Sequence, residues 1–213
     1  MEILSLVFII AIFLFSVVVH EVSHGMVANM LGDPTAKLAG RLTLNPLKHL
    51  DPLGSIILPG ILILMSILSG TGGIIFGWAK PVPVNPYNFR DQKYGNAKVS
   101  IAGPAANLFL ALFFGFFIRL IPYTSSLFFQ NMRIFFIYVV WINLILFVFN
   151  LWPGFPFDGY HLFSTFFPSL TERLDFLRNP IFSTLGAILF MGIIGFPYLC
   201  PFLFKLITGT SIL

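Results

Sequence analysis

The chain has 213 residues, of which 57% are hydrophobic and only 9% are charged. Since soluble domains carry about a quarter charged residues, this composition excludes a soluble globule and predicts a membrane protein. Twelve Lys and Arg against eight Asp and Glu give a net charge of +4, which is too little for a basic surface, so we expect no nucleic-acid partner. The one cysteine, Cys200, excludes an intrachain disulfide and a cysteine-based metal cluster.

Charge-poor segments mark the expected membrane elements, because about 20 apolar residues cross a hydrocarbon core roughly 30 Å thick. Residues 3–31 carry only Glu21, and four later segments carry no charge: 53–79, 99–118, 134–157 and 179–204. The first segment lacks the basic start of a signal peptide, so we expect it to be retained. The connectors between these segments are too short to form a soluble domain.

We therefore predict a single integral-membrane domain over residues 1–213, with an all-α polytopic fold of about four transmembrane helices. The expected core helices cover about residues 3–31, 97–121 and 133–157, and an extra C-terminal span covers about 180–205. Residues 36–44 partly alternate apolar and polar side chains, which favours a short membrane-associated β element. The segment after Lys80 contains three prolines, Pro81, Pro83 and Pro86, which require extended backbone, and it could lie beside that element.

The pattern that carries chemistry lies in the first span: His20-Glu21-Val22-Ser23-His24, an H-E-x-x-H motif. On a helix, positions i and i+4 share a face, so both imidazoles can reach one Zn²⁺ while Glu21 serves as general base toward water. Ionisable residues inside a span are costly unless the bundle supplies partners, which makes the motif more informative here than in a soluble chain. The alternative interpretation is a buried polar pair that fixes helix packing.

Two histidines leave a catalytic zinc site one protein ligand short. Among the acidic residues, Asp158 alone lies at the end of a charge-free span, just after Pro153 and Pro156. Irregular backbone at membrane depth survives only where it lines a buried cavity, so Asp158 is the candidate third ligand. It could equally be an ordinary turn aspartate at the water interface. Asn150, taken alone, could be a polar contact between helices.

Four motifs, in this order, resemble the site-2 protease family of intramembrane zinc metalloproteases in its short bacterial or archaeal form: His20-Glu21-Val22-Ser23-His24, Gly77–Pro86, Gly103-Pro104-Ala105-Ala106-Asn107 and Asn150–Gly159. The resemblance implies one Zn²⁺ bound by His20, His24 and Asp158, with Glu21 as the catalytic base. It also implies that Asn150 lies near the substrate or the reacting oxygen. Asn107, which matches the family's G-x-x-x-N element, could hold the substrate backbone or merely bridge helices.

The metal hypothesis also constrains the path of the chain, because zinc bonds are about 2 Å long and the ligands must therefore lie at one depth. An even number of crossings must then separate His24 from Asp158, so we expect residues 53–79 to form a re-entrant hydrophobic hairpin. This path places nine of the twelve basic residues on one side, which the positive-inside tendency makes cytosolic. We thus expect a multi-pass protein of the prokaryotic inner membrane with its active site toward the cytosol.

The function predicted from these features is a zinc-dependent intramembrane metalloendopeptidase. As the resemblance implies, it would cleave peptide bonds in or near the transmembrane segments of membrane proteins, with the lipid bilayer and such substrates as its partners. A rival interpretation is a membrane cation or proton transporter that uses the same His, Glu and Asp cluster, although the chain shows no paired inverted repeats. An inactive scaffold that only binds spans is disfavoured by the intact Glu21. His161 is expected to be a loop residue or to support the site from outside its ligands.

Overall fold

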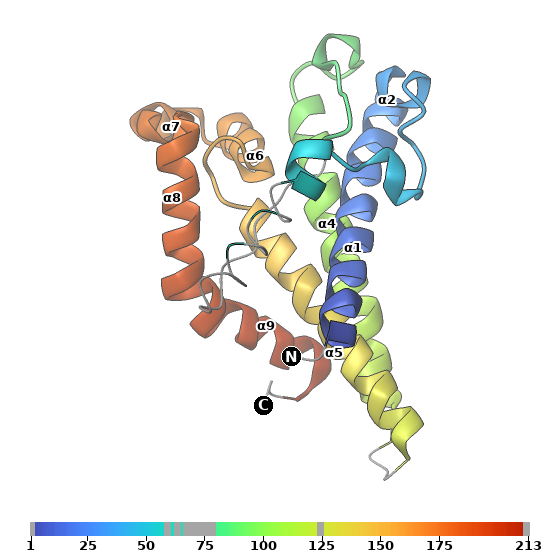
Figure 1. Ribbon diagram of the computed structural model, residues 1–213. Coiled ribbons are helices and arrows are strands. Elements are labelled where there is room, and N and C mark those ends of the chain that lie inside the picture. The colour runs from blue at the N-terminus through green and yellow to red at the C-terminus, as the bar shows by residue number, and fades with distance from the viewer. Residues whose placement is uncertain (1–2, 58–60, 62–64, 66–79, 123–125, 211–213) are drawn as a thin grey trace.

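The computed structural model of the chain describes residues 3–57, 61, 65, 80–122 and 126–210. The described residues form helices joined by short connectors, and none of them lies in a β-strand (Figure 1). Four helical segments are long and apolar enough to cross a membrane: Val7–Met30, Gly95–Leu120, Leu127–Asn150 and Pro180–Thr208. The predicted all-α polytopic fold with about four spans is therefore confirmed.

Three helices form the packed centre of the molecule: α1 (Ile3–Met30), α4 (Gly95–Leu120) and α5 (Leu127–Asn150). They lie side by side in Figure 1. α1 packs on α5 through Ile12, Val139 and Ile142. A second buried cluster joins α4 and α5 to the C-terminal helix and consists of Ala111, Ile118, Val140, Leu144 and Phe204. The outer faces remain apolar and exposed, as at Phe109 and Phe116, which suits a lipid surrounding.

The bounds of α1 and α4 agree with the predicted ranges to within two residues, whereas α5 differs from its predicted range of about 133–157. It begins earlier, at Leu127, because the residues before Arg133 continue the helix, and it ends at Asn150. It ends there because Pro153 lacks a backbone N–H and disfavours helical backbone in the residue before it. Residues 151–157 then leave the helix and lead into α6 (Asp158–Phe166).

The C-terminal span, predicted over about 180–205, consists of three helical pieces. These are α8 (Pro180–Phe190), the π-helix η5 (Met191–Leu199) and α9 (Cys200–Thr208). Pro197 inside η5 supplies no N–H to the helix, and a π-helical turn accommodates such a loss. In Figure 1, α8 descends apart from the three-helix centre, and the chain then turns so that α9 packs against α4 and α5. One apolar run in the sequence thus becomes two α-helices that are joined by a π-helix and have different neighbours.

The connector after α1 contains α2 (Thr35–Leu38), the 3-10 helix η1 (Pro46–Lys48) and the π-helix η2 (Pro52–Ile57). The β element predicted over 36–44 is not confirmed, because Thr35–Leu38 forms a helical turn and residues 39–44 are in no strand. The carboxylate of Asp33 accepts a hydrogen bond from Thr35 N and so favours this turn over the extended alternation. The predicted re-entrant hairpin over 53–79 lies largely outside the described residues.

The segment that precedes α4 returns to the end of α1. Residues 80–85 are extended, as their prolines require, and lead into the 3-10 helix η3 (Pro86–Asn88). Arg90 N then donates to Leu31 O at 2.8 Å, and Ala28, Phe89 and Val99 form one buried cluster. The end of α1 and the start of α4 therefore lie at the same end of the bundle. α6, α7 (Pro168–Arg173) and the 3-10 helix η4 (Asp175–Arg178) follow α5 at this end too (Figure 1).

Asp33 fastens the returning segment to the end of α1. Its carboxylate, fully buried, accepts hydrogen bonds from Asn85 N at 2.7 Å and from Asn88 Nδ2 at 2.8 Å, besides the N–H and hydroxyl of Thr35. Burial acts to raise the pKa of Asp33, but these donors outweigh it and lower the pKa below 3.8. Because the folded-state pKa is lowered, the stabilisation is present at neutral pH and is lost as the pH falls below 3.8.

Asp33→Ala is expected to loosen the segment from residue 80 to residue 94. Losing charge-assisted hydrogen bonds to buried donors costs about 1.5–3 kcal/mol, which raises the population of the locally open state about 10- to 100-fold. Trypsin cleavage after Arg90 and Lys93, followed over time in detergent micelles, measures this population. The matched control is Asp175→Ala, which removes only an exposed ion pair with Arg178. Equal cleavage rates in the two variants would contradict the anchoring role of Asp33.

Candidate metal centre

Two helices bring three potential metal ligands together at this end of the bundle. His20 and His24 lie one turn apart on α1 and are 6% and 9% exposed, and Asp158 is the first residue of α6. Their nearest ligand atoms all lie within 4.8 Å of one another. The Nε2 atoms of the two histidines are 3.0 Å apart, and Asp158 Oδ2 is 3.1 Å from Nε2 of His20 and 3.3 Å from Nε2 of His24.

The position of Asp158 depends on the break after α5. The residues that follow the break lead directly into α6, and Gly159 packs against the backbone carbonyls of Leu151 and Trp152, where a Cβ would collide with both oxygens. Glycine is needed here because the helix start approaches another backbone too closely for a side chain. The close contact holds the beginning of α6 against the residues that follow α5, and from there the carboxylate of Asp158 reaches His20 and His24.

The second ring nitrogen of each histidine faces an oxygen that can only accept. Nδ1 of His24 lies 2.7 Å from the backbone carbonyl of Val99, and Nδ1 of His20 lies 2.6 Å from Oδ1 of Asn107. Each Nδ1 must therefore carry the hydrogen, so each neutral imidazole has its lone pair on Nε2. This is the tautomer that a metal ligand needs, and the pattern of a ring N–H held by a carbonyl is typical of metal-binding histidines.

α4 packs against the two histidines at a glycine, where the backbone carries no side chain. Gly103 packs directly against the imidazoles, and an added Cβ would lie 2.6 Å from Nε2 of His20 and closer still to Nε2 of His24. Pro104, inside the same helix, removes the helical hydrogen bond to the carbonyl of Ser100 and loosens this turn. The adjacent carbonyl of Val99 is the one that accepts from His24.

The three facing atoms fit a divalent cation. When both imidazoles are neutral, their Nε2 atoms bear lone pairs and Asp158 Oδ2 is buried without a hydrogen-bond donor, so three acceptors meet with no proton among them. Such a group is unfavourable unless a positive charge lies between its members. Zinc ligands at tetrahedral corners about 2 Å from the metal lie about 3.3 Å apart, close to the spacings observed here. Two nitrogens and one carboxylate oxygen are also a donor set that catalytic zinc sites use.

Glu21 lies between the two histidines on α1 and is held by the extended segment. Its Oε2 accepts a hydrogen bond from the backbone N–H of Val82 at 2.8 Å. Val82 is itself fixed, because Lys80 N donates to His49 O and Arg41 donates to Lys80 O. This contact joins the H-E-x-x-H turn to residues 80–85, and no pattern in the sequence indicates it.

The remaining candidate residues differ in where the structure places them. Asn107 contacts His20 as described, and its Nδ2 donates to Asn143 Oδ1 at 2.8 Å. Asn150 donates to Leu146 O, one turn back in α5. His161 is exposed on α6 and is not in the metal-binding group of the described residues. Asn143 and Ser16 were not predicted, although Ser16 precedes His20 by four residues and Asn143 precedes Asn150 by seven, the spacing of one helix face.

Fold and site together define a multi-pass membrane protein with a buried pair of histidines and a carboxylate that fit one metal ion. The model of peptidase family M50 matches residues 118–193, which include Asp158. A protein of Bacillus subtilis (strain 168) named "Putative zinc metalloprotease YwhC" is 41% identical over 158 residues, covering 72% of this chain and 66% of that protein. A protein of Mycolicibacterium smegmatis (strain ATCC 700084 / mc(2)155), "Putative zinc metalloprotease Rip2", is 35% identical over 106 residues, 50% of this chain and 38% of that protein.

The chain belongs to peptidase family M50, and the resemblance to site-2 proteases is confirmed. The matched segments span about two thirds of the first relative and less of the second. No solved structure matches the chain significantly. None of these matches favours the transporter interpretation.

Proposed function

We propose that the chain is a zinc-dependent intramembrane endopeptidase. The observation that carries this proposal is the meeting of three acceptor atoms, from His20, His24 and Asp158, beside Glu21 and at the end of a membrane bundle. We propose these three residues as the ligands of one Zn²⁺. The relatives named as zinc metalloproteases support zinc as the metal.

In this proposal, bound zinc supplies Lewis-acid polarisation of the peptide carbonyl and makes water more acidic. Glu21 accepts a proton from the attacking water as the new carbon–oxygen bond forms. It then gives this proton to the amide nitrogen, so that the carbon–nitrogen bond breaks and a carboxylic acid and an amine are released. The hydrogen bond from Val82 N to Oε2 supports this role because it fixes the carboxylate in one orientation.

The proposed substrates are membrane proteins with a transmembrane helix. A helical substrate hides its carbonyls in i to i+4 hydrogen bonds, so it must unwind locally before one of them can reach the site. Residues 80–85 are extended and lie against Glu21. Pairing of an unwound substrate with this extended segment would offset the lost helix hydrogen bonds. Asn150, which ends α5 near the break, stays a candidate for holding the substrate or the reacting oxygen.

We propose that the site faces the cytosol of a prokaryotic cell, in the inner membrane. The connectors at the end of the bundle that holds the cluster carry most of the basic residues. Arg119, Arg133 and Lys205 lie near the other end, on α4, α5 and α9. By the positive-inside tendency, the end with the cluster is the cytosolic one.

Zinc stoichiometry and cleavage, measured on the same purified samples, test the proposal. The wild type, reconstituted in lipid vesicles, is expected to cut a single-span reporter and to hold one zinc, whereas His20→Ala and Asp158→Ala are expected to lose most of the zinc and the cleavage. His161→Ala is the matched control and is expected to keep both. A wild type that binds no zinc, or that conducts cations and cleaves nothing, would contradict the proposal.

A further inference from the structure

A buried asparagine in the middle of α5 connects indirectly to the metal centre. Asn143 is fully buried, and its Nδ2 donates to the backbone carbonyl of Val139 at 2.8 Å and to Ser16 Oγ at 2.9 Å. Its Oδ1 accepts from Asn107 Nδ2 at 2.8 Å. Asn107 is also fully buried and contacts His20. A series of hydrogen-bonded side chains therefore runs from Asn143 on α5 through Asn107 on α4 to His20 on α1.

Asn143, the residue farthest from the metal centre, fixes which groups donate and which accept in this series of hydrogen bonds. The carbonyl of Val139 can only accept, so the side-chain atom of Asn143 that faces it must be the NH₂ group. The oxygen of Asn143 then faces Asn107, and only the NH₂ group of Asn107 can donate to it. The carbonyl of Ser16, 3.4 Å from Asn107 Nδ2, favours the same orientation. Asn107 consequently presents its oxygen to His20.

The orientation of Asn107 decides the tautomer of His20. An oxygen 2.6 Å from Nδ1 requires the hydrogen on Nδ1 and leaves the lone pair of Nε2 directed at Asp158 and His24. A reversed Asn107 would offer a donor instead, and His20 would then hold its hydrogen on Nε2, where a metal must bind. The tautomer of a metal-binding histidine is set by the partner of its other nitrogen, and here that partner is itself set by Asn143.

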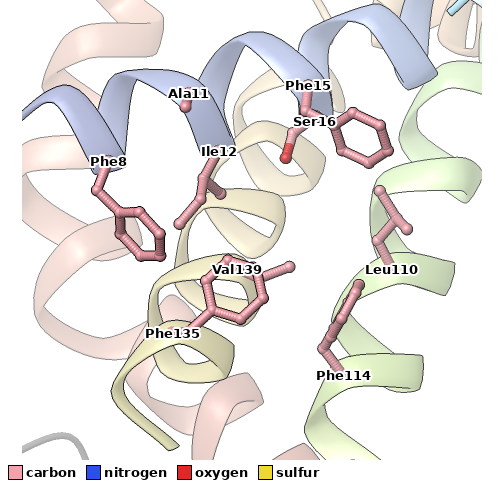
Figure 2. Close-up of a pocket in the computed structure, with 9 residues that line it drawn as sticks. All are labelled: Phe8, Ala11, Ile12, Phe15, Ser16, Leu110, Phe114, Phe135 and Val139. Atoms are coloured by element: carbon pink, nitrogen blue, oxygen red, sulfur yellow. The ribbon is translucent and has the colours of Figure 1, made fainter. Parts of the chain in front are cut away.

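The apolar surroundings leave Ser16, Asn107 and Asn143 to satisfy their hydrogen-bonding groups through one another and the nearby backbone. Ser16 borders an apolar pocket of about 230 Å³ between α1, α4 and α5, and Figure 2 shows its hydroxyl as the one polar group among the labelled side chains. The other residues that line this pocket are apolar as well. Buried amides in such surroundings must find their partners within the protein, because an unpaired one is costly. The three polar residues therefore form one connected set.

We infer that Asn143 is a positioning residue for the metal centre, which holds His20 in its metal-binding tautomer through Asn107. This inference rests on the proposed role of His20 as a metal ligand. It adds to that role a residue of α5 that lies outside the four motifs of the sequence. Ser16 contributes less, since the Val139 carbonyl alone already fixes the direction of Asn143.

The first test reads the tautomer directly. ¹⁵N chemical shifts of the four histidines in the metal-free protein, in micelles at mildly alkaline pH, distinguish hydrogen on Nδ1 from hydrogen on Nε2. The wild type is expected to show the Nδ1–H form at His20, identified by its absence in His20→Ala. Asn143→Leu, similar in shape but without the acceptor, is expected to mix both forms. A single wild-type tautomer in this variant would overturn the inference.

The second test measures zinc affinity by competition with a chelator. Asn143→Leu is expected to weaken zinc binding about 10- to 100-fold, and Asn143→Ala carries the same expectation if the leucine variant cannot be purified. Asn143→Asp keeps an acceptor toward Asn107 and is expected to retain near wild-type affinity, as is Ser16→Ala. Asn131→Leu, an exposed position on the same helix, is the matched control.

The outcomes separate this inference from the proposed function. A purely structural role would make the carboxylate of Asn143→Asp, placed inside the membrane bundle, at least as harmful as leucine, and that order of affinities would overturn the inference. Wild-type affinity in Asn143→Leu, with zinc lost in His20→Ala, would overturn the inference alone. A wild type that binds no zinc would instead remove the proposed function.

Discussion

Glu21→Gln is expected to lower the rate of peptide cleavage about 1000-fold while the zinc content stays that of the wild type. The amide oxygen of glutamine can still accept the hydrogen bond that Val82 N donates to Glu21, so the local structure is kept. Glutamine cannot take a proton from water, and the proposed proton transfer stops. Single-turnover cleavage of a reporter span in vesicles, with metal analysis of the same sample, measures both quantities.

The control for this variant is Glu172→Gln, the same change at an exposed position of α7. It is expected to leave the rate and the zinc content unchanged. Full activity in Glu21→Gln with zinc bound would show that another group accepts the proton, and the proposed mechanism would be wrong. Loss of zinc together with activity would instead mean that Glu21 acts on the metal centre rather than on water.

Gly103→Ala is expected to weaken metal binding strongly and, with it, to abolish cleavage. The added methyl group would lie 2.6 Å from Nε2 of His20, in contact with the ligand nitrogens themselves. Either the imidazoles rotate away from Asp158 or α4 moves away from α1. Overpacking of this kind costs about 1–3 kcal/mol of stability. Because the methyl takes the space in front of the ligand atoms, we expect zinc affinity to fall about 100-fold or more.

Gly192→Ala is the matched control, since a Cβ at that position of η5 would meet no atom within 4 Å. Zinc titration and thermal unfolding in detergent, carried out on both variants, separate loss of the site from loss of the fold. The expected result for Gly103→Ala is a folded protein whose unfolding temperature falls only as far as a loss of about 1–3 kcal/mol predicts, with zinc affinity about 100-fold or more below that of the wild type. Wild-type zinc affinity in Gly103→Ala would mean that the metal does not bind at the atoms proposed here.

Much of the fold follows from local composition. The runs of apolar residues predict four spans, and α1 and α4 lie within two residues of their predicted ends, because a helix that crosses lipid satisfies its backbone within itself. The predicted ends of α5 were less accurate. The helix continues through the charged Arg133 and ends at Asn150, before the prolines that follow it. The β element over 36–44 was not confirmed because the Asp33 carboxylate, a single local contact, favours a helical turn.

The candidate site divides in the same way. The sequence by itself determined that the chain is a membrane protein and that His20, Glu21 and His24 share one helical turn, because hydropathy and the i, i+4 spacing are properties of neighbouring residues. It also left Asp158 as the candidate third ligand, by elimination among few acidic residues. Only the tertiary structure decided that Val82 holds Glu21, that Gly103 lies against the imidazoles, and that Asn143 orients Asn107. The contacts of Glu21 with Val82 and of Asn107 with Asn143 join residues 61 and 36 positions apart. Their geometry depends on how three helices pack, which no local pattern specifies.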